Sequence, residues 1–259
     1  MDIEKKYIKE LTALKKYVRN DYIYEMFKNY GFSIYDKELK KTVFISLDSN
    51  INIYEACFIA LCIQIYISKF YEKNNNLNIL EIGLAYGTSS LIIANELVLH
   101  SQKFKSNINY DVIDYYQSTQ WKNIGHENVN LFIKDNNYIN YKLYKYLSIE
   151  IMSKLKKNNN KYDIIFIDGG HDEITVNNDM YYSHKMLKIN GIIIIDDVLH
   201  SSVKKAIKNF LYKYGKYYRR ISIGKSQDFR KEYKIYTKEM FKKNVFNPST
   251  MYCFQKKNE

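Results

Sequence analysis

Two short runs of consecutive apolar residues constrain the fold of this chain more than any other feature. They are IIFI at positions 164–167 and IIII at positions 192–195, and an aspartate follows each run directly. A strand with one solvent-facing side alternates apolar and polar residues, whereas a strand covered by helices on both faces is apolar throughout. Runs of four residues are also too short for helices. They therefore predict two central strands of an open α/β sheet.

The surrounding sequence alternates strand-like and helix-like segments, which is typical of parallel strands joined by crossover helices. The predicted parallel strands are residues 78–82, 110–114, 130–133, 163–168 and 191–196. A helix is predicted at 202–214, and strand-like runs at 219–223 and 251–255 close the sheet as a hairpin around a long basic insert. We therefore expect a Rossmann-like α/β fold, with a mostly parallel seven-stranded sheet and an antiparallel last strand.

The first part of the chain has a different pattern. Apolar residues recur every three or four positions within residues 4–30, and residues 53–72 have the composition of a more buried helix. We therefore expect a single domain over residues 1–259. It would consist of a helical N-terminal extension, residues 1–72, and a Rossmann-like core, residues 73–259.

Several classes of protein are disfavoured by simple counts. The longest apolar stretch, residues 56–67, is shorter than the roughly 20 residues that a membrane-spanning helix needs. The first residues mix acids with bases and lack the apolar segment of a secretory signal. Three cysteines without metal-ligand spacing favour neither a disulfide framework nor a zinc site. We expect a cytoplasmic protein without a membrane association.

The basic charge is confined to one end of the chain. The formal net charge is +12, and residues 201–259 contain 16 Lys and Arg against 4 Asp and Glu. One interpretation is a surface that attracts an acidic partner such as nucleic acid. The other is a solvated lysine-rich face, which we favour because basic residues alone give only nonspecific attraction.

A glycine turn follows the first predicted strand, in the segment ILEIGLAYGTSS. Gly83 and Gly87 would let a ligand approach the backbone closely, and the N–H groups of the next helix would favour an anionic group. A dinucleotide site needs G-x-G-x-x-G, but Ala85 and Thr88 occupy the second and third glycine positions. The motif is instead E-x-G-x-x-x-G-x-S, from Glu81 to Ser89.

With this motif between a strand and a helix, the chain resembles the class I S-adenosylmethionine-dependent methyltransferases. Within them it is similar to the metal-dependent O-methyltransferases that act on catechols and macrolide sugars. The resemblance implies that S-adenosylmethionine is the cofactor and that Asp114 accepts hydrogen bonds from its ribose. It places Asp135 near the adenine. The other implied cofactor-binding residues are Glu81, Gly83, Gly87 and Ser89. Trp121, a little further along the chain, would line the cofactor cleft or belong to the core.

Three aspartates end the fourth and fifth predicted strands. Asp168, Asp196 and Asp197 would repel one another unless a cation or a proton lies between them, and clustered carboxylates suit Mg²⁺. In the resembling family, the matching positions bind a divalent metal, and a basic residue three positions after the first acid takes the acceptor's proton. That residue here is His171. The simpler alternatives are that the aspartates cap helices and that His171 is a polar turn residue.

The expected function is Mg²⁺-dependent methylation of a hydroxyl on a small molecule. Catechol enzymes carry Lys at the position of His171 and Asn at the position of Asp197, so the resemblance favours a sugar acceptor. One alternative is an RNA or protein methyltransferase that uses the basic C-terminal region. The other is a non-catalytic protein that binds S-adenosylmethionine. The oligomeric state stays open.

Overall fold

The fold is described from a computed structural model. It describes residues 31–36, 41–46, 51, 53–71, 75–221 and 250–258. The helices predicted within residues 4–30 and the basic insert at 225–248 lie outside these described residues.

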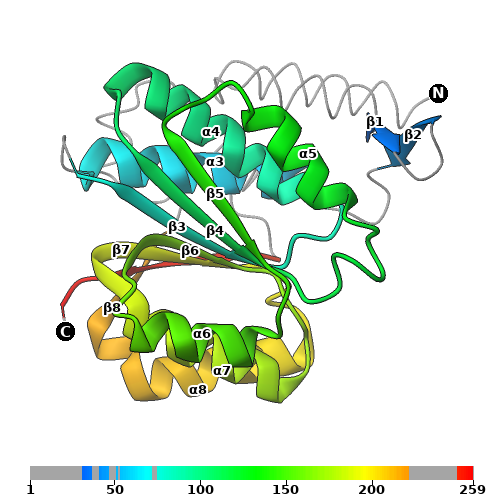
Figure 1. The fold of residues 1–259 in the computed structure, drawn as a ribbon. Coiled ribbons are helices and arrows are strands. Elements are labelled where there is room, and N and C mark those ends of the chain that lie inside the picture. The colour runs from blue at the N-terminus through cyan, green and yellow to red at the C-terminus, as the bar shows by residue number, and fades with distance from the viewer. Residues whose placement is uncertain are drawn as a thin grey trace, which may run out of the picture.

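A seven-stranded sheet forms the centre of the molecule, in the order β5-β4-β3-β6-β7-β9-β8 (Figure 1). Strands β3 to β7 run parallel, β9 is antiparallel to β7, and β8 is antiparallel to β9. The bounds of the strands are Leu77–Ile82 for β3, Ile108–Ile113 for β4, Ile139–Tyr144 for β5, Tyr162–Ile167 for β6, Leu187–Ile195 for β7, Tyr218–Ile221 for β8 and Tyr252–Lys256 for β9. The predicted Rossmann-like fold with an antiparallel closing strand is confirmed.

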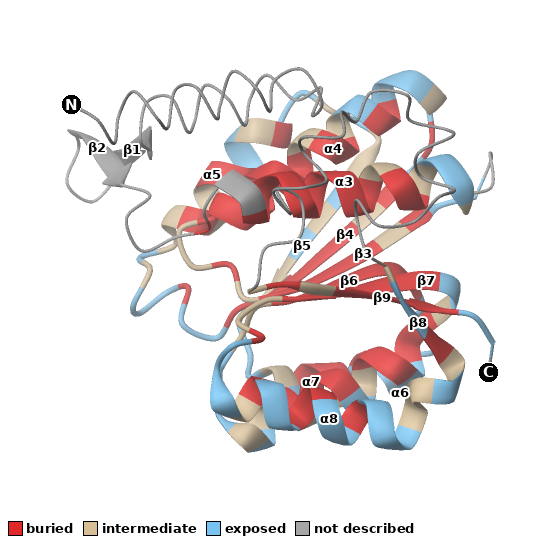
Figure 2. Ribbon diagram, turned by 180° about the vertical axis from the view of Figure 1, so that it is seen from behind, coloured by how far each residue is buried: buried red, intermediate tan, exposed pale blue. Residues whose placement is uncertain are grey.

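Helices cover both faces of this sheet, as Figure 1 shows. One layer consists of α3 (Ile53–Lys69), α4 (Thr88–Phe104) and α5 (Ile124–Ile133). The other consists of α6 (Ser148–Lys157), α7 (Glu173–Met186) and α8 (Ser201–Tyr214), which leads into the short 3₁₀ helix η1 (Gly215–Tyr217). The central strands β3, β4, β6 and β7 are buried over most of their length (Figure 2), with one hydrophobic cluster on each face. Two-sided burial explains why the runs IIFI and IIII do not alternate.

The amino ends of the central strands are tied together by Asp163 at the start of β6. Its carboxylate accepts hydrogen bonds from the hydroxyl of Tyr66 at 2.6 Å and from the backbone N–H of Asn78 at 2.8 Å. The Lys188 ammonium lies 2.8 Å from the same carboxylate. These bonds link α3, β3 and β7 to β6. They fix the amino ends of these strands. The acids at the carboxyl ends of the strands take no part in these bonds.

One predicted strand is wrong. Residues 130–133 belong to the C-terminal half of α5. The third parallel strand in chain order is instead β5, which begins at Ile139, six residues after the end of the predicted strand. Within α5 the apolar residues follow helical spacing, because Val129 and Ile133 are buried while Leu131 is 64% exposed. Strand β5 is an edge strand whose exposure alternates along its length. The prediction that Asp135 lies near the adenine depended on this misassigned strand.

The N-terminal extension contains more than helices. Helix α3 confirms the helix predicted at 53–72, but a two-stranded antiparallel hairpin, β1 (Gly31–Asp36) and β2 (Lys41–Ser46), was not predicted. In the part of the chain that the structure describes, no helix combines the length and the apolar composition needed to cross a membrane.

Candidate active site

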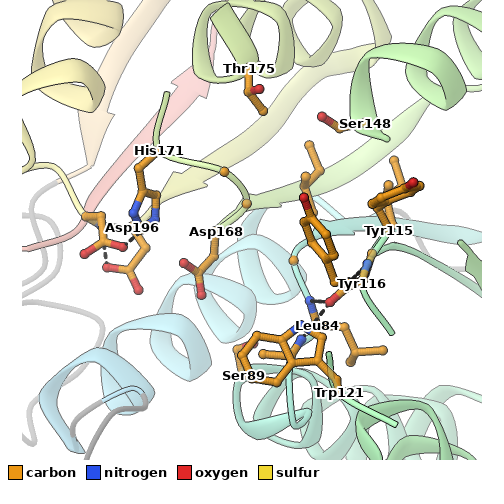
Figure 3. A pocket seen from close by; sticks show the side chains of 18 of the residues that line it. Leu84, Ser89, Tyr115, Tyr116, Trp121, Ser148, Asp168, His171, Thr175 and Asp196 are labelled. Atoms are coloured by element: carbon orange, nitrogen blue, oxygen red, sulfur yellow. Dashed lines mark hydrogen bonds and ion pairs between the residues drawn. The ribbon is translucent and has the colours of Figure 1, made fainter. Parts of the chain in front are cut away.

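A cavity of about 710 Å³ opens at the carboxyl ends of β3, β4, β6 and β7. Strand order reverses here, because β3 pairs with β4 on one side and with β6 on the other. Open α/β sheets place their ligands at this point. The residues that line the cavity come from the ends of these strands and the segments that follow them, from the segment after β5, and from Ile51 and Glu55 (Figure 3).

The glycine turn after β3 touches the end of β6. Gly83 has a φ of +96°, and a Cβ there would lie 1.9 Å from the carbonyl oxygen of Asp168. The backbone after β3 and the backbone at the end of β6 are in contact here, and only glycine fits into this contact. Gly87, with a φ of +89°, precedes the first turn of α4 and faces the backbone of Gly125. Gly83 lines the cavity, whereas Gly87 is not among its lining residues.

Glu81 lies beneath the turn and is fully buried. Its carboxylate accepts hydrogen bonds from the hydroxyls of Ser89 and Ser90, both at 2.7 Å, and from the hydroxyl of Tyr110. Burial raises the pKa of Glu81 to about 7, although the three hydroxyl donors act in the opposite direction. Ser89 lines the cavity but Glu81 does not, so Glu81 fixes the start of α4 from below.

Asp114 follows β4 and braces the same turn from the cavity side. One carboxylate oxygen accepts the backbone N–H groups of Leu84 at 3.0 Å and Ala85 at 2.8 Å, and the other accepts that of Tyr116 at 2.8 Å. The side-chain amide of Gln117, which is fully buried, donates to Asp114 at 3.1 Å and to the carbonyl of Ala85 at 2.7 Å. The turn is therefore held in place by the chain itself.

Aromatic side chains form a wall beside Asp114. Tyr115, Tyr116 and Trp121 line the cavity, as does the segment 146–148 that follows β5 (Figure 3). Trp121 packs edge-on against Tyr86, with ring centroids 4.8 Å apart. From the sequence, Trp121 could line the cleft or belong to the core, and Tyr115, Tyr116 and residues 146–148 were not predicted. The two tyrosines directly follow a predicted strand end, which was a usable signal.

The position predicted for Asp135 is wrong. Asp135 lies in the turn between α5 and β5, at the amino end of a strand, and it is not among the cavity residues. Its neighbour Asn136 donates to the hydroxyl of Ser101 near the end of α4. The residues that follow the carboxyl end of β5 are Tyr146, Leu147 and Ser148. The error follows directly from placing the strand at 130–133.

The acids of β6 and β7 meet on the other side of the cavity. One ligand atom each from Asp168, His171 and Asp197 lies within 4.8 Å of the others, which is close enough to hold a metal ion. The Nε2 atom of His171 lies 2.8 Å from a carboxylate oxygen of Asp197. Asp196 lies alongside and lines the same cavity, and its carboxylate accepts the backbone N–H of Asp197 at 2.7 Å. The structure therefore brings the three predicted acids and His171 together.

Burial and mutual repulsion shift the pKa values of the residues in this group. Burial raises the pKa of Asp168 well above its usual range, and the charges of Asp196 and Asp197 add to the effect. Burial, followed by the charge of Glu55, raises the pKa of Asp196 to about 7. The hydrogen bond between His171 and Asp197 raises the pKa of the histidine and lowers that of the aspartate. These hard oxygen donors fit a divalent cation, which would allow all the carboxylates to ionise.

Helix capping does not account for these acids. Helix α7 is capped by Asp172, whose carboxylate accepts the backbone N–H of Thr175 at 3.0 Å. Helix α8 follows His200, and no side chain supplies a capping hydrogen bond there. Asp168, Asp196 and Asp197 are therefore available for another role.

Comparison with known proteins agrees with this geometry. Residues 80–198 match a family described as "Methyltransferase domain". The comparison with curated proteins gives no match. Among solved structures, the O-methyltransferase NovP superposes with a TM-score of 0.55 at 12% identity, covering 80% of this chain and 81% of NovP. An O-methyltransferase from Bacillus cereus in complex with SAH gives 0.54 at 14% identity, covering 81% and 84%.

The two superpositions establish the fold, and the family match covers the strands and turns that build the cavity, from β3 to the end of β7. Residues 80–198 thus match a methyltransferase domain, and the fold around them is one that the two solved O-methyltransferases share.

Proposed function

We propose that this enzyme methylates a hydroxyl group of a small molecule in a reaction that requires Mg²⁺. One observation carries the proposal: a single cavity has the braced glycine turn and Asp114 on one side and Asp168, His171, Asp196 and Asp197 on the other. A methyl donor and a hydroxyl acceptor need adjoining sites, because effective transfer depends on holding them in line.

The cofactor would occupy the side of β3 and β4. Gly83 places no side chain where the turn meets the end of β6, and the Ser89 oxygen, whose proton is donated to Glu81, offers an acceptor at the start of α4. The Asp114 oxygen that accepts only the backbone N–H of Tyr116 would accept a ribose hydroxyl with its remaining lone pair. The tyrosines 115 and 116 and the segment 146–148 offer apolar surface for the adenine. S-adenosylmethionine supplies a methyl group that its sulfonium has already activated.

Asp168, Asp196 and Asp197 would hold the metal. When bound, Mg²⁺ supplies positive charge that makes a nearby hydroxyl more acidic. The geometric cluster consists of Asp168, His171 and Asp197 and does not include Asp196. Imidazole suits transition metals better than magnesium, so an ion held by Asp168, His171 and Asp197 would be of another kind. The three-aspartate set leaves His171 available for proton transfer, which is why we favour it.

His171 would act as the general base. Its Nε2 donates to Asp197, which orients the ring and leaves Nδ1 to receive a proton. The acceptor hydroxyl would give its proton to His171 while its oxygen bonds to the methyl carbon. The sulfur–methyl bond breaks in the same step, and the sulfonium leaves as the neutral thioether S-adenosylhomocysteine. Histidine suits this transfer because the ordinary pKa of an imidazole, about 6.5, lies close to neutral pH. The solved O-methyltransferases that share the fold support oxygen as the methylated atom.

The test combines calorimetry with an activity screen. The protein is titrated with S-adenosylmethionine and then assayed for methyl transfer to hydroxylated acceptors with Mg²⁺, with Mn²⁺ and with a chelator. We expect micromolar binding and transfer that the chelator abolishes. Equal rates with and without the chelator would reject the metal mechanism. Cofactor binding without transfer to any acceptor would favour a binding protein, and transfer to RNA or protein alone would reject the small-molecule acceptor.

A further inference from the structure

One buried acid lies directly behind the wall of the cavity. Asp179, in the middle of α7, is fully buried and does not line the cavity itself. A Cβ on Gly169 would lie 3.6 Å from its Oδ2 atom, so its carboxyl group packs against the segment that follows Asp168. The side chain of Ser148, at the start of α6, is close enough to lower the pKa of Asp179. Gly169 and Ser148 both line the cavity, so Asp179 lies behind two parts of its wall that follow different strands.

The carboxyl group of Asp179 has no hydrogen-bond partner among the residues that the structure describes. Other buried acids of the sheet differ, since Asp111 and Asp163 each accept a tyrosine hydroxyl at 2.6 Å. A buried acceptor without a partner costs free energy of folding, and burial raises the pKa of Asp179 to about 7. Hydrogen bonds around a ligand site are often long or poorly aligned until the ligand binds. An unsatisfied acid behind a ligand cavity is explained if its partner bond forms in the ligand-bound state.

Two side chains are near enough to supply the missing donor, because the Ser148 hydroxyl and the Asn178 amide both lower the pKa of Asp179. Asn178 precedes Asp179 in the same helix and does not line the cavity, so a bond from it would not respond to a ligand. Ser148 lies in the cavity wall on the side of Tyr115, as Figure 3 shows. The segment 146–148 faces the adenine in the proposed function. Ser148 is therefore the donor that cofactor binding would move.

On this geometry we propose that Asp179 is a positioning residue for the cofactor: when S-adenosylmethionine binds, the hydroxyl of Ser148 donates a hydrogen bond to the Asp179 carboxyl group. Because Asp179 also packs against Gly169, the bond ties the start of α6 to the segment that carries Asp168. It thereby holds the adenine wall at a fixed distance from the acids of β6 and β7, as in-line methyl transfer requires. The inference deepens the proposed function and rests on it. Asp179 does not line the cavity, so it acts only through Ser148 and Gly169.

Asp179→Leu tests the role, because leucine has a similar size and removes both acceptor oxygens. The Kd of S-adenosylmethionine, measured by calorimetry, should rise about tenfold, close to the lower end for a hydrogen bond to a charged group. The urea midpoint of unfolding should rise at the same time, since a buried acid without a partner is removed. Asp179→Asn keeps one acceptor oxygen and should leave the Kd within about threefold of the wild-type value. Loss of stability and affinity together would indicate a structural role and overturn the inference.

A double-mutant cycle identifies the partner. Ser148→Ala should raise the Kd about tenfold in the wild-type background, and it should have little further effect once Asp179→Leu is present. Asn178→Ala is the matched control, because it removes the other nearby donor and should leave the Kd unchanged. If the leucine variant does not fold, Asp179→Ala takes its place in the cycle.

Each outcome decides the inference. Coupled effects of Asp179→Leu and Ser148→Ala, with affinity retained in Asp179→Asn, support it. Independent effects that multiply in the double variant, an unchanged Kd in Asp179→Leu, or an equal loss of affinity in Asn178→Ala overturn it while leaving the proposed methyl transfer intact. Failure of the wild-type protein to bind S-adenosylmethionine rejects the cofactor assignment, and the inference with it.

Discussion

The two sides of the cavity use carboxylates in opposite ways. On the side of β3 and β4, Glu81 and Asp114 are surrounded by donors from the chain, namely hydroxyls for the first and backbone N–H groups for the second. On the side of β6 and β7, burial raises the pKa values of Asp168 and Asp196, and the further carboxylates that they face add to the rise. Carboxylates that the fold has satisfied build the turn, whereas carboxylates that repel one another need a cation or a proton between them.

The largest effect should come from removing an acid of the unsatisfied side. Asp168→Asn should lower kcat/KM about a thousandfold or more, because several kcal/mol of metal-dependent stabilisation would be lost. The cofactor Kd, measured by calorimetry, should stay within about threefold, since electrostatic contributions of this kind act mainly in the transition state. The variant would separate the two sides of the cavity experimentally.

Asp172→Asn provides the matched control. Asp172 is also an aspartate that lines the cavity, but its carboxylate caps α7. Asparagine caps helices about as well as aspartate, so the substitution should change the free energy of unfolding little and leave most of the activity. Equal losses of activity in the two variants would mean that the acids of β6 and β7 have no special role.

His171→Gln should have the next largest effect, lowering kcat about a hundredfold. The base must be neutral, so the rate of the wild-type enzyme should fall as the pH drops through the pKa of His171, which Asp197 raises above the usual value near ~6.5. The variant should lack this acidic limb in its pH–rate profile. His200→Gln is the control, because His200 lies beside His171 with ring centroids 5.3 Å apart and bonds to Ser202. If His200→Gln lost the acidic limb and His171→Gln kept it, His200 and not His171 would be the general base.

The sequence predicted the unsatisfied side better than the satisfied one. Strands that are apolar throughout and end in acids identify β6 and β7 and the place where their acids meet. Strand β5 was missed because its exposed positions carry Asn140 and Lys142, a pattern that a surface segment shares. The bonds of Glu81 and Asp114 depend on how the turn folds back onto β4, and Glu55 reaches the cavity only through the packing of α3. No local sequence pattern predicts either these bonds or the place of Glu55.

A smaller loss is expected when the braced turn is disturbed. Asp114→Asn replaces one acceptor oxygen by an amide that cannot accept the N–H groups of Leu84 and Ala85 if it faces them. We expect the cofactor to bind about tenfold more weakly, the lower range for a hydrogen bond to a charged group. Asp111→Asn is the control on the same strand, because Asp111 accepts the hydroxyl of Tyr162 and does not line the cavity. Equal weakening in both variants would point to a general loosening of β4.

The smallest effect on cofactor affinity, within about twofold, should follow Glu81→Gln, since Glu81 does not reach the cavity. Its signature should appear in stability instead. The folded pKa of Glu81 is about 7, above its unfolded value of 4.5, so the folded state binds the proton more tightly. The contribution of this residue is then complete below pH 4.5 and is lost as the pH rises towards 7 and beyond. The total loss is up to about 3 kcal/mol.

Chemical denaturation at pH 5 and pH 8 measures this difference. Glutamine resembles the protonated acid, so the variant should lose less stability than the wild type between the two pH values. Glu150→Gln, at an exposed site in α6, should behave like the wild type. If Glu81→Gln instead weakened the cofactor tenfold at both pH values with an unchanged stability profile, Glu81 would contact the ligand directly. The satisfied side of the cavity would then bind through its carboxylates just as the other side does.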